Sequence, residues 1–179
     1  MDPTGRDDAN EADELVLAYL TCPKDPSNNF LGAVLITDAR SRPLHFGFVT
    51  PVRPTTMQRL LYGSTLAEHV RVDVITRKLW SDGIPVIPDV VFVDDQAMLA
   101  ARRTVGIPTA HLTRETGPAL ATNLSTIRYF TGDNRDDEQA VGQIVAMLDG
   151  TIDLLDPFRR IGDALKEALK AKDGNAVAR

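Results

Sequence analysis

The chain is poor in the residues that build disulfides and zinc sites. Its 179 residues include one cysteine and three histidines. Cys22 has no second cysteine to pair with, so an internal disulfide is excluded. With only His45, His69 and His111 as further ligands, the chain cannot assemble an ordinary zinc site. Each histidine stands alone in the sequence, and we expect each to be a surface or core residue rather than a catalytic base.

Long apolar runs and excess positive charge are also missing. Nothing approaches the roughly 18 consecutive apolar residues of a membrane span. Residues 1–14 are acidic and polar, unlike a secretory signal, which is basic and then apolar. The net charge of -5 and the pI of about 5.2 provide no basic field for nucleic acid or anionic membranes. We therefore expect a soluble cytoplasmic protein without membrane association, for which nucleic acid is an improbable partner.

Three common catalytic signatures are absent: the nucleophile elbow, the Walker-type phosphate loop and the dinucleotide glycine fingerprint. Residues 132–137 are similar to the start of a calcium loop but lack its twelve-residue ligand pattern ending in Glu. We interpret them as a loop with a helix N-cap. No resident cofactor is expected from these patterns.

The composition predicts one domain with short tails. A hydrophobic content of 43% suffices for a sizeable core. Residues 1–13 are charged and rich in turn formers, which predicts a disordered tail. Residues 14–171 form the predicted α/β domain with C-terminal helices, and residues 172–179 a flexible tail.

Strand signals dominate the first half of the domain. Residues 15–20, 30–37 and 44–50 are separated by short turn-rich stretches, which predicts an antiparallel meander of three strands. Residues 90–93 are apolar at successive positions, as in a central parallel strand buried on both faces. A further short strand is predicted at residues 107–112. The strand and helix order favours a mixed sheet, antiparallel first and parallel later.

Helix signals fall between and after these strands. Thr55 and Gln58 form a capping box for a short helix that ends at Gly63, and Thr65 with Glu68 repeats the pattern for a longer one. The buried face of the longer helix is predicted from helical spacing as Leu66, Val70, Val74 and Leu79. Either of two aspartates, Asp94 and Asp95, can cap a helix over residues 96–104 that stops at Gly106.

The last third of the chain is predicted to be helical. A helix over residues 136–148 carries an apolar stripe made by Val141, Ile144, Val145 and Leu148. A final helix begins at Asp156 and Pro157, and its apolar face consists of Phe158, Ile161, Leu165 and Leu169. We expect this face to dock onto the sheet. The alternative is a protruding helix that pairs with a protein partner or with another subunit in a homo-oligomer.

Asp94 and Asp95 directly follow the buried strand, where open α/β sheets place their chemistry. The order of elements over residues 14–112 resembles the ribonuclease H-like fold. That resemblance implies carboxylates around two divalent metals, Mg or Mn, which clamp a phosphodiester. Asp94 and Asp95 would supply metal ligands, although residues 15–20 lack the acid expected on the first strand. The role that we favour for both aspartates is helix capping, and metal binding is the alternative.

A second candidate site lies at the start of the short helix. Arg53, Thr55 and Thr56 surround a helix N-terminus, whose free amides favour a phosphate or carboxylate. Arg59 and Tyr62 lie three residues apart and share a helix face. The sequence thus predicts an anion site, with ion pairs from Arg53 and Arg59 to acids such as Asp94 as the structural alternative.

Two classes of function remain. The preferred hypothesis is a non-catalytic binding or assembly module, since no complete catalytic set is present and the segment around Arg53 is stiff and polar. The alternative is a metal-dependent nuclease or phosphodiesterase that uses Asp94 and Asp95. A small-ligand sensor that binds an anion at Thr55 and Thr56 is a third hypothesis.

Overall fold

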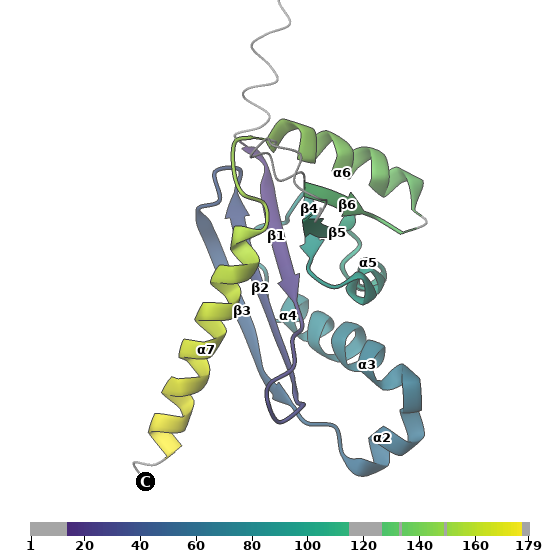
Figure 1. Ribbon diagram of the computed structural model, residues 1–179, viewed down its shortest axis with the longest axis vertical. Helices are drawn as coiled ribbons and strands as arrows, with labels where there is room; N and C mark the ends of the chain where they lie inside the picture. Colours follow the sequence, from purple (N-terminus) through teal and green to yellow (C-terminus); the bar gives the residue numbers. More distant parts are fainter. Residues whose placement is uncertain (1–13, 115–126, 133, 149, 177–179) are drawn as a thin grey trace, which may run out of the picture.

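A six-stranded mixed sheet with the order β3-β2-β1-β4-β5-β6 forms the middle layer (Figure 1). The computed structural model describes residues 14–114, 127–132, 134–148 and 150–176. The strands are β1 (Val16–Thr21), β2 (Phe30–Asp38), β3 (Pro43–Val52), β4 (Val90–Val93), β5 (Thr109–Arg114) and β6 (Ile127–Phe130). The predicted mixed α/β class is confirmed, whereas the predicted tail at residues 1–13 lies outside the described residues.

The sheet is antiparallel toward both edges and parallel in its middle. β1 pairs antiparallel with β2, and β2 pairs antiparallel with β3. β4 lies parallel between β1 and β5, and β6 returns antiparallel beside β5. The carboxyl ends of β1, β4 and β5 therefore meet at one end of the sheet, where chain segments leave the strands.

β4 is the central strand that its sequence predicts. All four of its residues are buried. Val90 and Phe92 belong to the core on one face of the sheet, and Val91 and Val93 belong to the core on the other. This alternation follows from the period of two in a strand, and it explains why a run without polar residues is required here.

β6 was not anticipated from the sequence. It has four residues, three of them exposed, and it pairs only with β5. A short edge strand of this kind needs no apolar run, because solvent covers its open side. Its strand formers, Ile127, Tyr129 and Phe130, span only four residues, a pattern too short for us to have predicted a strand.

α6 (Arg135–Leu148) and α7 (Asp156–Ala176) cover one face of the sheet. The predicted stripe of α6 is confirmed, with Val141, Ile144 and Leu148 buried. On α7, Ile161 and Leu165 are buried against the same core. The helix extends to Ala176, which takes it into the stretch that the sequence assigned to a flexible tail.

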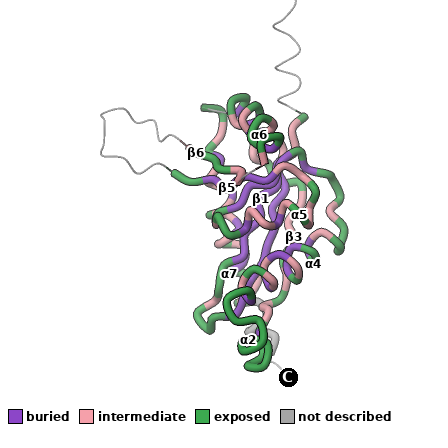
Figure 2. The backbone as a smooth tube through the Cα atoms, turned by 90° about the vertical axis from the view of Figure 1, so that its right-hand side faces the viewer, coloured by how far each residue is buried: buried purple, intermediate pink, exposed green. Residues whose placement is uncertain are grey.

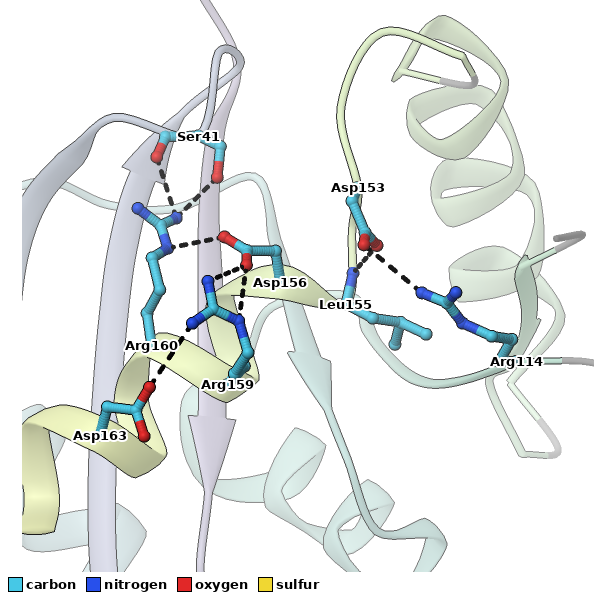
Figure 3. Close-up of polar contacts among 8 residues, drawn as sticks. All are labelled: Ser41, Arg114, Asp153, Leu155, Asp156, Arg159, Arg160 and Asp163. Atoms are coloured by element: carbon cyan, nitrogen blue, oxygen red, sulfur yellow. Dashed lines mark hydrogen bonds and ion pairs between the residues drawn. The ribbon is translucent and has the colours of Figure 1, made fainter. Parts of the chain in front are cut away.

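Polar contacts anchor the beginning of α7 (Figure 3). Arg160 donates to the carbonyl and hydroxyl oxygens of Ser41 at 2.9 and 2.6 Å, and it pairs with Asp156 at 3.2 Å. Ser41 lies in the turn between β2 and β3. Arg114 of β5 meets Asp153, just before the helix, at 3.4 Å. The docking of α7 onto the sheet, preferred from the sequence, is what the structure shows for this part of the helix.

Short helical elements follow β3. They are α2 (Thr56–Tyr62), the 3-10 helix η1 (Gly63–Thr65), α3 (Leu66–Glu68), the π-helix η2 (His69–Thr76) and α4 (Arg77–Ser81). After β4 come the 3-10 helix η3 (Gln96–Ala101) and α5 (Arg102–Val105). From α3 onward these elements pack on the face of the sheet opposite α6 and α7. α2 instead extends past the end of the sheet (Figure 1).

The π-helix changes which side chains face the sheet. Val70, Val72, Ile75 and Thr76 are buried, whereas Val74 is 39% exposed. The prediction that Val74 shares the buried face was wrong. Hydrogen bonds from residue i to i+5 widen the turn beyond the α-helical repeat on which that prediction depends.

The predicted helix ends at Asp95 and Gly106 are confirmed, and the predicted cap at Thr65 is wrong. Asp95 caps η3 by accepting from the amide of Ala97 at 2.9 Å, and Gly106 ends α5 in the left-handed region at φ 72°. Thr65 caps nothing. Its backbone is helical and its hydroxyl donates to the Tyr62 carbonyl at 2.8 Å, because the helical path runs through it. In the described part of the chain, no helix has the length and apolar character needed to cross a membrane.

Candidate functional site

Asp94 lies at the carboxyl end of β4, beside the end of β1. The register pairs Leu20 with Val93, which places Thr21 next to Asp94. The Thr21 hydroxyl donates to Asp94 Oδ2 at 2.6 Å. His111 of β5 pairs in register with Val93 and lies near enough for its charge to affect Asp94. The sheet thus brings together residues from three strands at the predicted position.

Asp95 has a different set of partners. Its Oδ1 accepts from the Ala97 amide at the start of η3, and its Oδ2 receives the Arg71 guanidinium at 2.9 Å. The sequence suggested Arg53 or Arg59 as the cation that meets these acids. The structure assigns that place to Arg71, since the segment that contains Arg53 and Arg59 leads away from the sheet.

The π-helix positions Arg71. The Arg71 carbonyl accepts from the Thr76 hydroxyl five residues later, at 2.8 Å, and its guanidinium carbon lies 6.0 Å from the centre of the Phe30 ring. The side chain is 18% exposed. Arg71 was not predicted from the sequence, because the ordinary α-helical repeat does not indicate that this side chain would lie at the end of β4.

Burial governs the ionisation of the acid and the thiol at this end of the sheet. Desolvation raises the pKa of Asp94, the Thr21 hydroxyl opposes that rise, and the nearby Asp95 charge adds to it. The Asp94 residue nonetheless keeps an exposed surface. Cys22, at the end of β1, is 5% exposed, and desolvation raises the pKa of its thiol to about 12. Such a thiol is a poor nucleophile.

These residues do not fit the two-metal site implied by the ribonuclease H-like resemblance. β1 reads VLAYLT and carries no carboxylate. Asp94 is held by Thr21, and Asp95 is held by a helix amide and by Arg71. Among the residues that the structure describes, no group of three or more His, Cys, Asp or Glu side chains could hold a metal ion. The capping role, favoured from the sequence, is confirmed for Asp95.

The second predicted site belongs to a segment that we call the α2 segment, residues 53–65. The predicted capping box is confirmed: Gln58 N donates to Thr55 Oγ1 at 3.2 Å, and Thr55 N donates to Gln58 Oε1 at 2.8 Å. The amide of Gly63 closes the helix on the Arg59 carbonyl. The Tyr62 ring stacks on His69 with centroids 4.4 Å apart. Local contacts therefore hold the segment in one shape.

The apolar side chains of the α2 segment face solvent. None of the seven residues of α2 is buried. Leu60 and Leu61 are 74% and 76% exposed, Met57 is 62% exposed, and Tyr62 is 38% exposed. Figure 2 shows α2 as an exposed stretch at one end of the molecule. A contiguous group of large exposed apolar side chains is unusual on a monomer and marks interaction surfaces.

The polar residues predicted for anion binding lie on the same segment. Arg53, Thr56 and Arg59 are exposed, and Pro54 beside them is buried. Hydrogen bonds from Asn29 lower the pKa of Asp25, and the Arg53 charge adds to this effect, so Arg53 lies near the loop between β1 and β2. Thr55 is engaged in the capping box, and Tyr62 stacks on His69.

A hollow of about 580 Å³ lies elsewhere, between η2–α4 and α5, and is lined by Arg77, Trp80, Arg103 and neighbouring polar residues. Of its two arginines, Arg103 pairs with Glu68 at 2.7 Å and with Asp73 at 3.6 Å. These acids largely neutralise it. None of the residues predicted to form a site lines this hollow.

In comparisons with known proteins, no family model and no curated protein matches the chain. We therefore infer what the chain binds from the geometry of its two predicted sites.

Proposed function

We propose that the chain is a binding or assembly module that docks onto a protein partner through the α2 segment. The observation that carries the proposal is the exposure of Met57, Leu60, Leu61 and Tyr62 on one short helix with no buried residue. Burying a leucine or a methionine of this kind contributes roughly 1.5–3 kcal/mol. Exposed apolar side chains in a contiguous group are therefore a plausible source of binding energy.

The local structure of the α2 segment supports this role. The capping box at Thr55 and the stacking of Tyr62 on His69 hold the helix before any partner arrives. A preformed surface loses less conformational entropy on binding than a flexible one does. The segment also projects beyond the sheet, so a partner can reach it without displacing another element (Figure 1).

The charges of the segment indicate the chemistry of the partner. Residues 53–65 contain Arg53 and Arg59 and no acidic residue, in a chain whose net charge is -5. We propose a partner surface with an apolar groove and carboxylates at its rim, which would use the predicted anion-binding residues Arg53, Thr56 and Arg59. The apolar face of α7 is the weaker choice, because Ile161 and Leu165 are packed against the sheet. A cytoplasmic location, as the composition predicts, suits such a module.

A matched pair of variants tests the proposal. Leu61→Asp places a charge in the α2 segment, and Ile87→Asp places the same charge at another strongly exposed apolar position, 82% exposed. A photoreactive cross-linker at position 61 would first identify the partner, whose affinity is then measured with purified proteins. We expect Leu61→Asp to weaken binding by about a hundredfold and Ile87→Asp to leave it unchanged. Equal effects of the two substitutions would rule out the α2 segment as the docking surface.

We also propose, for the fold alone, the ribonuclease H-like assignment. The antiparallel run of β1, β2 and β3, with β4 parallel beside β1, supports it. The alternative function, a metal-dependent nuclease or phosphodiesterase at Asp94 and Asp95, has less support because their carboxylates are engaged within the chain. Cleavage of DNA or RNA in magnesium or manganese that is lost in Asp94→Asn would establish this alternative against the binding module.

A further inference from the structure

The free edge of β3 differs from the other edge of the sheet. β3 has ten residues and contains no Asp, Glu, Lys or Arg. β6, at the opposite edge, has four residues and includes Arg128. Natural sheets protect an edge by keeping it short or by placing charges on it, as β6 does. β3 has neither protection between Pro43 and Pro51.

The side chains of β3 are also incompletely covered. Phe46 and Phe48 stack with centroids 5.9 Å apart, and Phe48 is 41% exposed while Leu44 is 47% exposed. On the other face of the strand, a groove of about 280 Å³ runs between β3 and the helix formed by η2 and α4. Its lining includes the apolar Val49, Val52, Val74 and Ile75 and the charged Lys78 and Asp82. Both faces of the edge strand thus offer apolar surface next to a backbone edge that no described strand pairs with.

The charges beside this edge favour a second copy of the chain as its occupant. Lys78 and Asp82 are one helical turn apart on α4 and its C-cap, and they pair at 2.6 Å. Because the pair carries both signs, a two-fold axis beside it would bring charges of opposite sign from the two copies toward each other. A surface with charges of one sign would repel its own copy, whereas this one is self-complementary.

We propose that β3 pairs antiparallel with β3 of a second copy, with Gly47 near the two-fold axis, and joins the two sheets into one. This register places Phe46 opposite Phe48 of the other copy and Leu44 opposite Thr50. The two stacked aromatic pairs then meet as cross-strand neighbours, an arrangement that stabilises antiparallel sheets. The proposal concerns a surface distinct from the α2 segment and does not depend on the function proposed for that segment.

Sedimentation velocity of the full chain over a concentration series is the first test. We expect a species of twice the 19.6 kDa of one chain. The double substitution Leu44→Lys and Phe48→Lys should shift the protein to the one-chain mass with an unchanged circular dichroism spectrum. Leu61→Lys, a matched control on the α2 segment, should leave the dimer intact. A wild-type protein of one-chain mass, a dimer that survives the double substitution, or a dimer lost in Leu61→Lys would each overturn the proposal.

A cross-linking test keeps the result independent of any folding defect in the lysine variant. Directly opposed residues in an antiparallel pair have Cα atoms about 4.5–5.5 Å apart, which is within reach of a disulfide. A chain with both Leu44→Cys and Thr50→Cys should form a covalent dimer on mild oxidation. With Leu44→Cys alone, the two thiols would be separated by about 20 Å along the strands and should not link. Equal cross-linking in the double and the single variant would contradict the register.

Discussion

The carboxyl end of β4 and the α2 segment differ in where their side chains find partners. At the end of β4, Asp94 bonds to Thr21, and Asp95 bonds to the η3 amide and to Arg71. In the α2 segment the polar backbone is satisfied locally, but Leu60 and Leu61 remain about three-quarters exposed. At the end of β4, where open α/β sheets place their chemistry, the polar residues make contacts within the fold. The apolar residues of the surface helix α2 face solvent instead. The comparison teaches that partners within the chain, more than exposure or residue type, separate the two roles.

The strongest test of this contrast compares thiol reactivity at the two places. The pKa of Cys22 is raised from 9.0 to about 12, so at neutral pH its thiolate is about a thousandfold rarer than that of an ordinary cysteine. We expect the native protein to react with a thiol reagent at least a thousandfold more slowly than the protein unfolded in urea. A cysteine placed at position 61 in a Cys22→Ser background should react at the unfolded rate. Fast labelling of native Cys22 would show that the end of β1 is open.

Two arginine substitutions test the contrast through stability. Arg71→Ala removes the partner of Asp95 and the packing over Phe30, and should cost about 1–2 kcal/mol in the free energy of unfolding. Arg59→Ala, on the exposed α2 helix, should cost less than about 0.5 kcal/mol. Urea unfolding of both variants measures the difference. Equal losses would mean that the α2 segment is as integrated into the fold as η2.

Two threonine substitutions sharpen the same contrast. Thr21→Val keeps the shape of the side chain but removes the hydroxyl that donates to Asp94, which should cost about 1 kcal/mol. Thr56→Val, at an exposed position in the first turn of α2, should change stability by no more than a few tenths of a kcal/mol. Thermal unfolding followed by circular dichroism compares the two variants. If Thr21→Val loses no more stability than Thr56→Val, the Thr21 hydroxyl bonds to water as favourably as it bonds to Asp94.

The smallest expected effect concerns the charge of Asp94. Its pKa in the folded protein is raised by desolvation, so the stability that its protonated form contributes is present at low pH and is lost as the pH rises through the folded pKa. Asp94→Asn should therefore stabilise the protein at pH 7 by a few tenths of a kcal/mol, since the partly exposed carboxyl is screened by water. The difference from wild type should shrink as the pH falls toward 4. A destabilised variant at pH 7 would instead indicate that the charged carboxylate is favoured.

Local patterns were sufficient for some of these features. The continuous apolar run of β4 predicted a strand buried on both faces, and the spacing of Thr55 and Gln58 predicted the capping box. The stripe of Val141, Ile144 and Leu148 predicted the buried face of α6. In each case the decisive contacts lie within a few residues or follow directly from a regular repeat.

Other features required the assembled structure. The π-helix moved Val74 out of the core and aimed Arg71 at Asp95, because its repeat departs from the one assumed in reading the sequence. β6 is held by its pairing with β5, and its strand formers span only four residues. The sequence by itself thus determined the class of fold, the helix caps at Thr55 and Asp95, and the core of β4, α6 and α7. Only the tertiary structure decided which acid meets which arginine and which leucines stay exposed, because those outcomes depend on which distant segments come to lie side by side.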